Sequence, residues 1–197
     1  MSKGRLEAFS DGVIAILITI MVLELRPPHE ATLEALRPLA PNFAAYALSF
    51  VFLGIYWNNH HHMLQATRTV SGAVLWANLH LLFWLSLVPF VTAWLGENHG
   101  ESLPTAAYGA VMMLAGIAYY VLERTIIAAE GPESTLAAAV GQETKGIASV
   151  VLYGLAILLA FVHQRIADTI YLIVALMWLV PDRRIESTVS SRERHRV

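Results

Sequence analysis

RLEAFSDGVIAILITIMVLEL, at residues 5–25, is the stretch that decides the fold class. A bilayer core of about 30 Å requires about 20 mostly apolar residues per helix, and this run has that length. Pro27 and Pro28 follow it, and proline ends a helix because it has no backbone N–H and its ring clashes with the preceding turn. Asp11 within the apolar run and the lack of a small-residue cleavage site exclude a cleaved signal peptide. The stretch therefore predicts a membrane-spanning helix.

The composition of the whole chain agrees with a membrane protein. Of its 197 residues, 56% are hydrophobic and 14% are charged, whereas a soluble domain has roughly 45–50% and about 25%. So few polar residues cannot cover the surface of a soluble globule, and the formal net charge of -2 gives no reason to expect a nucleic-acid partner. Because the chain has no Cys, disulfides, thiol nucleophiles and cysteine metal sites are excluded.

Five further apolar stretches predict membrane spans. Lipid permits only helices or closed barrels, and these stretches are too long for strands. We therefore predict an all-α integral membrane protein with six transmembrane helices per subunit in residues 1–181, followed by a basic cytoplasmic tail at 182–197 that we expect to be disordered. The last two spans are short and form a tight hairpin. The five stretches are 42–64, 73–95, 105–127, 146–162 and 166–180.

The Lys and Arg residues predict the orientation, since positive charge collects in cytoplasmic loops. With the N-terminus inside, ten of the 13 basic residues lie on the cytoplasmic side, and Arg26, Arg37 and Arg165 lie outside. We therefore expect a multi-pass protein of the plasma membrane, surrounded by lipid, with both termini in the cytoplasm. The ten inner residues are Lys3, Arg5, Arg68, Arg124, Lys145, Arg183, Arg184, Arg192, Arg194 and Arg196.

The first predicted helix carries one narrow stripe and a separate polar site. At about 100° per residue, four side chains fall within about 40° of Arg5, and Ile20 flanks them. Asp11 lies about 120° away, beside Ser10. Spacing alone favours an amphipathic helix that buries one face among its neighbours, and it does not say which face meets what. The four stripe residues are Gly12, Ile16, Thr19 and Leu23.

Three predicted helices bring polar side chains to one layer near the cytoplasmic face. Asp11 lies about 9 Å above the inner end of the first helix, and polar residues of the second and third helices lie at a comparable depth. In hydrocarbon such groups must pair with one another. We therefore predict a hydrogen-bonded cluster of Ser10, Asp11, some residues of 58–62, and Asn78 or His80.

The triplet His60, His61 and His62 admits three interpretations: a metal site, a pH-sensitive polar cluster or a plain structural network. Consecutive helical residues point about 100° apart, so the three cannot chelate one ion without ligands from elsewhere. Hydrolase and phosphate-loop signatures are absent from the sequence. We expect no metal, no cofactor and no enzymatic activity.

The motif Arg-x-x-x-Phe-Ser-Asp, formed by Arg5, Phe9, Ser10 and Asp11 at the cytoplasmic start of the first helix, resembles the endolysosomal potassium channel family, transmembrane protein 175, in its bacterial branch. The resemblance is strongest over residues 5–26, looser over 57–63 and 78–95, and limited to span number and length beyond that. It implies a homotetramer whose first helices line a central pore. It also implies a channel without the conventional Thr-Val-Gly-Tyr-Gly filter, which the sequence indeed lacks.

The resemblance implies a role for each residue of the stripe. Ile16, five positions after the motif Asp, would form the constriction, and Ile20 and Leu23 would form further hydrophobic rings. Thr19 matches the pore threonine of the family, and Ala15 stands where some members carry a hydroxyl residue. The motif would form a gating and packing network with polar groups of the second and third helices. The residues of this network would be Arg5, Phe9, Ser10, Asp11, Asn58, His61, Asn78 and His80.

These observations lead us to expect a potassium-selective cation channel with a hydrophobic constriction, in which potassium is the permeant ion. One alternative is a proton channel or proton-coupled transporter that uses Asp11 and the His cluster as a relay. Against a transporter, the sequence suggests no helix broken in mid-span and no internal repeat. Another alternative is a membrane enzyme or metal protein built on residues 60–62.

Overall fold

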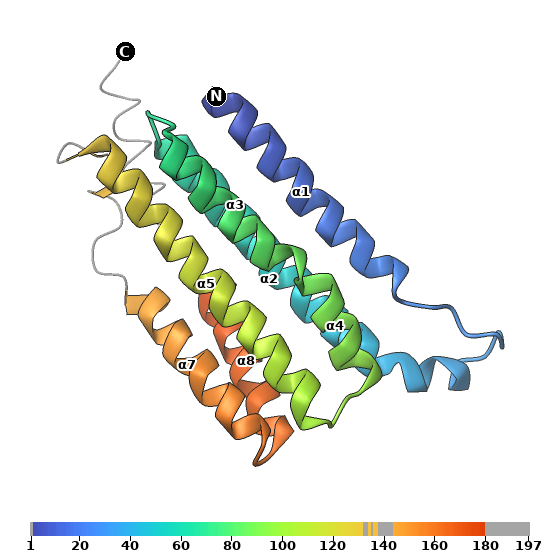
Figure 1. Cartoon of the computed structure of the whole chain (residues 1–197). Coiled ribbons are helices and arrows are strands. Elements are labelled where there is room, and N and C mark those ends of the chain that lie inside the picture. Colours follow the sequence, from blue (N-terminus) through green and yellow to red (C-terminus); the bar gives the residue numbers. More distant parts are fainter. Residues whose placement is uncertain (1, 132–133, 135, 138–143, 180–197) are drawn as a thin grey trace.

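The computed structural model describes residues 2–131, 134, 136–137 and 144–179, so the predicted tail at 182–197 lies outside the described residues. Every regular element within these ranges is helical, as the sequence predicted (Figure 1). The elements in chain order are α1 (Lys3–Leu23), the 3-10 helix η1 (Glu34–Leu39), α2 (Ala40–Ala66), α3 (Gly72–Ser86), α4 (Val88–Glu97), α5 (Ser102–Glu130), α7 (Thr144–Ala160) and α8 (Gln164–Leu179).

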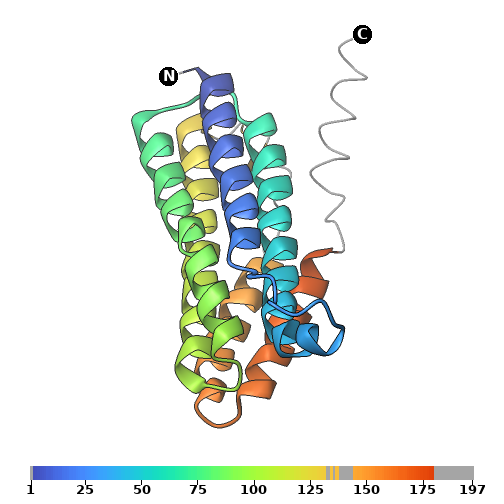
Figure 2. The same cartoon turned by 90° about the vertical axis from the view of Figure 1, so that its right-hand side faces the viewer.

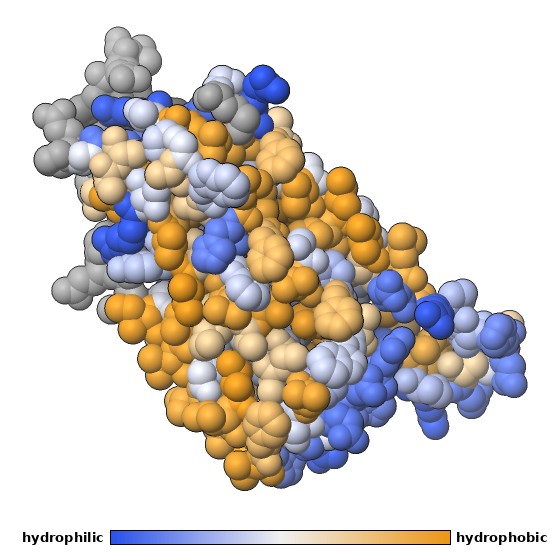
Figure 3. Space-filling view, in the orientation of Figure 1, coloured by the Kyte–Doolittle hydropathy of each residue, from blue (hydrophilic) through white to orange (hydrophobic). Residues whose placement is uncertain are grey.

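Four segments of the described chain are long and apolar enough to cross a membrane: Lys3–Leu23, Glu34–Ala66, Gly72–Glu97 and Ser102–Glu130. They coincide with the first four predicted spans. The fifth and sixth predicted spans correspond to α7 and α8, which are helices of 17 and 16 residues packed against each other. Figure 3 shows apolar side chains over the middle of one face and hydrophilic ones toward its ends, the distribution that a bilayer requires.

The third span is interrupted, and here the prediction of unbroken spans was wrong. α3 ends at Ser86 and α4 begins at Val88, and the Leu87 N–H bonds three residues back to the Trp84 carbonyl at 3.2 Å. Pro89 explains the interruption, since it has no N–H to donate to the carbonyl four residues earlier. The absence of a broken helix therefore no longer argues against a transporter.

α1 lies on one side of the bundle, where it packs on α2, α3 and α4 (Figures 1 and 2). Its side chains alternate between a buried and an exposed face at the helical period. The buried face points at the rest of the subunit, while α7 packs on α5 and α8 packs on α7, α5 and α2. The residues of the buried face are Leu6, Ser10, Ile14, Leu17 and Met21.

Candidate pore face and polar network

The stripe singled out on α1 lies on its uncovered face. Ile16 is 56% exposed, Ile20 40% and Leu23 75%, and Gly12 and Thr19 are also exposed. α1 does bury one face among its neighbours, as spacing alone favoured, but that is the opposite face. The constriction residues implied by the resemblance therefore contact little of their own subunit.

Thr19 presents a hydroxyl oxygen on this face. Its Oγ1 lies 3.1 Å from the Ala15 carbonyl and 2.9 Å from the Ile16 carbonyl, so the hydroxyl proton is directed back to the helix. The lone pairs of the same oxygen remain available as an acceptor. An oxygen held in this way can contact a cation.

Ser10, His60 and Asn78 form a buried chain of hydrogen bonds that links three helices. His60 Nε2 donates to Asn78 Oδ1 at 2.7 Å, and Asn78 Nδ2 donates to Ser10 Oγ at 3.0 Å. Ser10 in turn donates to the Leu6 carbonyl at 2.9 Å. All three side chains are at most 1% exposed. Because each donor has an acceptor, the chain stabilises the contact of α1 with α2 and α3 at membrane depth.

Asp11 lies outside this chain and has a different partner. The Trp57 indole N–H donates to Asp11 Oδ1 at 3.1 Å, and the bond lies on the exposed surface of α1 and α2. The His61 ring stacks on Trp57, with centroids 6.2 Å apart and planes at 28°. The predicted single cluster is therefore two separate groups, one buried and one exposed.

Of the residues 58–62 that the predicted cluster included, His60 joins the buried network, whereas His61 and Asn58 do not. Neighbouring helical residues point about 100° apart, and His60 shares the buried face of α2 with Leu53 and Leu64. Leu53 lies seven residues before His60 and Leu64 lies four residues after it, so the three share one face of the helix. This spacing was the signal in the sequence that could have identified His60 as the buried histidine.

The other predicted network residues lie on the surface of the subunit. His80 is exposed and accepts a hydrogen bond from the Trp84 indole at 2.9 Å. Arg5, Phe9, Asn58 and His61 are likewise exposed. Of the predicted network, the structure brings Ser10 and Asn78 together and leaves the rest apart from them.

A second buried polar group, toward the other end of the bundle from the Ser10–Asn78–His60 chain, was not predicted. Thr92 Oγ1 lies 2.7 Å from Ser49 Oγ and 2.7 Å from the Val88 carbonyl, and Ser49 Oγ lies 3.0 Å from Tyr108 Oη. This group joins α2, α4 and α5 next to the break in the third span. A threonine three residues after Pro89 was the only local signal for it.

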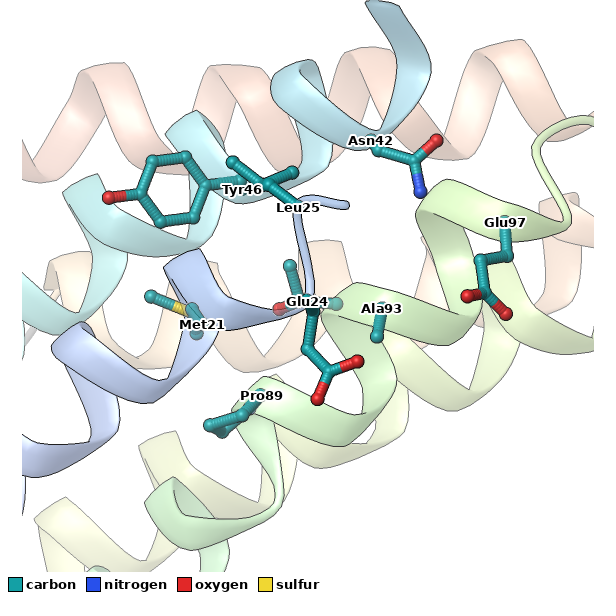
Figure 4. A pocket seen from close by; sticks show the side chains of 9 residues that line it. Met21, Glu24, Leu25, Asn42, Tyr46, Pro89, Ala93 and Glu97 are labelled. Carbon is teal, nitrogen blue, oxygen red and sulfur yellow. The ribbon is translucent and has the colours of Figure 1, made fainter. Parts of the chain in front are cut away.

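A pocket opens between the C-terminal ends of α1 and α4 and the N-terminal end of α2 (Figure 4). Glu24 and Glu97 bring two carboxylates to it, and Asn42 and Tyr46 line it from α2. No three His, Asp or Glu side chains in the described ranges come together in a way that could hold a metal ion. Glu24 and Glu97 therefore give the C-terminal ends of α1 and α4 an acidic character.

Comparisons with known proteins agree on one family. Residues 5–89 match the model of the endosomal/lysosomal potassium channel TMEM175. A potassium channel from a Chryseobacterium species is 51% identical over 96% of this chain and 98% of its own length. The mouse endosomal/lysosomal proton channel TMEM175 is 29% identical over 82% of this chain, which spans 36% of the mouse protein.

The fold agrees as well. The crystal structure of a lysosomal potassium-selective channel TMEM175 homologue from Chamaesiphon minutus superposes with a TM-score of 0.70 and 27% identity over 90% of this chain and 96% of that one. The matched proteins are channels and not enzymes, and the resemblance noted from the Arg-x-x-x-Phe-Ser-Asp motif is confirmed. The chain thus belongs to the TMEM175 family of endosomal/lysosomal potassium channels.

Proposed function

We propose that the protein is a potassium-selective cation channel of the plasma membrane. Four subunits of six transmembrane helices each surround a pore that is lined by α1 and has no conventional filter. One observation carries the proposal: α1 buries one face in the subunit and leaves the Ile16–Leu23 stripe uncovered. The potassium channels similar to this chain support the choice of ion.

The distribution of polar residues supports an oligomer. Within the subunit, 28% of the most apolar stretch of Lys3–Leu23 is buried and 22% of that of Glu34–Ala66, against 44% for Gly72–Glu97 and 50% for Ser102–Glu130. The two least covered spans carry Asp11, Asn58 and His61. Polar residues at membrane depth face protein or water because lipid does not solvate them. Further copies of the chain would provide that protein and water.

The stripe has the chemistry of a hydrophobic gate. In a ring of four, Ile16 side chains meet on the axis, and Ile20 and Leu23 follow one and two turns further out. An ion crossing such a ring loses hydration with no ligand in return, which is a barrier to permeation. Thr19, between the rings, offers a hydroxyl oxygen. Closed symmetry explains why one helix per subunit suffices to enclose a pore.

Ion flux into liposomes tests this proposal. Purified protein is reconstituted, and potassium and sodium uptake are measured separately at equal protein content. We expect potassium uptake to exceed sodium uptake. Equal uptake of the two ions contradicts selectivity, and no uptake of either contradicts the channel.

The second candidate is a proton channel, which the name of the mouse relative favours. The relevant group is the partly exposed Asp11 carboxylate bonded to Trp57. Asp11→Asn keeps an oxygen for the indole N–H but removes the titratable group. If protons are the carried ion, this variant loses proton uptake driven by a pH gradient, whereas a potassium channel keeps its potassium uptake.

A further inference from the structure

α2 and the α3–α4 segment each carry three large aromatic side chains at intervals of seven residues. Seven residues make nearly two helical turns, so the α2 set lies along one line of its helix and Trp76 and Phe83 along one line of α3, while Phe90 follows on α4, past the break at Leu87. Every one of the six is between 45% and 76% exposed in the subunit. We call these two lines the α2 ladder (Phe43, Phe50 and Trp57) and the α3 ladder (Trp76, Phe83 and Phe90).

The two ladders belong to helices on opposite flanks of α1. Figure 2 looks at the subunit from the α1 side, with α2 on one side of α1 and α3 and α4 on the other. This step rests on the proposed function: if α1 faces a fourfold axis, rotation brings the α2 flank of one subunit to the α3 flank of the next. An interface between two different flanks closes into a ring.

The heights of the ladder residues match across such a contact. α2 ends and α3 begins at the same inner end, joined by residues 67–71. At about 1.5 Å per residue, Trp57 lies about 14 Å above that end and Phe83 about 17 Å. Phe50 lies about 24 Å above it and Phe90 about 27 Å. Trp57 therefore lies at nearly the same height as Phe83, and Phe50 at nearly the same height as Phe90. Two aromatic pairs can thus form between helices that run in opposite directions.

Small residues alternate with the large ones on α2. Ala47 and Gly54 each lie four residues after a ladder phenylalanine, which repeats the four-three spacing of interlocking helices. A Cβ built on Gly54 meets no atom within 4 Å in the described subunit. Contacts within the subunit therefore do not require a glycine at position 54. A large side chain from a neighbouring helix would fill the space beside it.

Polar residues on the same lines distinguish a protein neighbour from lipid. His61 continues the α2 line beside the Asp11–Trp57 pair, and His80 lies on the α3 line. By contrast, the exposed side chains in the middle of α7 and α8 are aliphatic, among them Val151 and Leu172, and the exposed Asp168 and Thr169 lie in the first two turns of α8. Lipid suits the α7–α8 face, and polar groups at membrane depth require the other face to meet protein.

We infer that the α2 ladder of one subunit packs against the α3 ladder of a second copy of this chain, with Phe50 level with Phe90 and Trp57 level with Phe83. The aromatic side chains interlock around Ala47 and Gly54 and hold the ring together around α1. The interface is directional, because each flank meets the other flank and never itself.

Disulfide cross-linking between copies tests this interface, since the chain has no Cys of its own. Phe50→Cys and Phe90→Cys are made in separate chains with different tags, co-expressed and oxidised in the membrane. We expect a cross-linked dimer that carries both tags, and no cross-link from either variant expressed alone. Val151→Cys with Leu172→Cys, at matching depth on the α7–α8 face, is the control and should give none.

A second pair, Trp57→Cys with Phe83→Cys, tests the same interface if a variant of the first pair fails to assemble. Cross-linking of Phe50→Cys with itself, or failure of both pairs in protein that migrates as an oligomer, overturns the inference. Potassium uptake of the unmodified channel is measured alongside. Uptake without cross-links refutes the interface alone, and cross-links without uptake refute the channel and leave the interface in place.

Discussion

Ile16 and Ile18 are two residues apart on α1 and have different surroundings. Ile16 is 56% exposed, and Ile18 packs against the hydrophobic core of the subunit. If Ile16 forms the narrowest ring, Ile16→Asn replaces apolar side chains on the axis with amides that hold water, which lowers the barrier to ions. We expect higher potassium uptake into liposomes and a smaller preference for potassium over sodium, at equal oligomer yield.

Ile18→Asn is the matched control for this substitution. It buries an amide against apolar neighbours, so it should reduce the yield of folded protein without raising uptake. Unchanged uptake in Ile16→Asn together with a leak in Ile18→Asn means that the pore faces the other side of α1.

Asn78 is the middle member of the buried Ser10–Asn78–His60 chain, and it satisfies both neighbours. Asn78→Leu keeps a side chain branched at the same atom but leaves the Ser10 oxygen and the His60 N–H unpaired. Each unpaired buried group costs roughly 1–3 kcal/mol. We expect a lower melting temperature of the purified protein by tryptophan fluorescence. If Asn78→Leu melts at the same temperature as the unmodified protein, the chain is not important for stability.

At the scale of elements, α5 and α8 approach each other closely at Gly109. A Cβ on this glycine would collide with the Tyr171 hydroxyl, which donates to the Thr105 carbonyl at 2.8 Å. Gly109→Ala must therefore displace a buried tyrosine and break its hydrogen bond. We expect it to destabilise the folded protein by about 1–3 kcal/mol, measured as the shift of thermal melting.

Gly116 lies on the same helix and provides the matched control. A Cβ there would meet Tyr56 Oη at 3.7 Å, an ordinary contact distance. Gly116→Ala should be neutral or slightly stabilising, since alanine is the better helix former. If both variants melt alike, the contact between α5 and α8 does not depend on the missing Cβ.

At the scale of the whole molecule, the number of spans can be tested with topology reporters. A reporter after Val197 is expected in the cytoplasm, but four spans and six spans predict the same result there. A reporter in the turn between α7 and α8, after Val162, separates them. If both helices cross the membrane it lies outside, and if neither crosses it lies inside. The reporter is one that is active only in the cytoplasm. We expect it to be inactive after Val162 and active after Val197.

Much of the architecture could be predicted from the sequence, because transfer of an apolar run into lipid depends on that run alone. The first four predicted spans coincide with helical segments long and apolar enough to cross a membrane, and the motif at Arg5–Asp11 indicated the family. The stripe on α1 followed from the helical period. The break at Leu87 does not follow from the apolar length of the span, because it results from the N–H that Pro89 lacks.

The pairing of polar residues required the tertiary structure. Depth along a helix follows from residue number, so the sequence by itself determined that Ser10, His60 and Asn78 share a layer. The rotation of α2 about its axis decides whether His60 or His61 points inward, and many packed side chains set that rotation together. The same packing turned the Leu6–Met21 face of α1 inward and left Ile16 uncovered. Sequence therefore determined which helices form and how deep each residue lies, and only tertiary packing decided which faces meet.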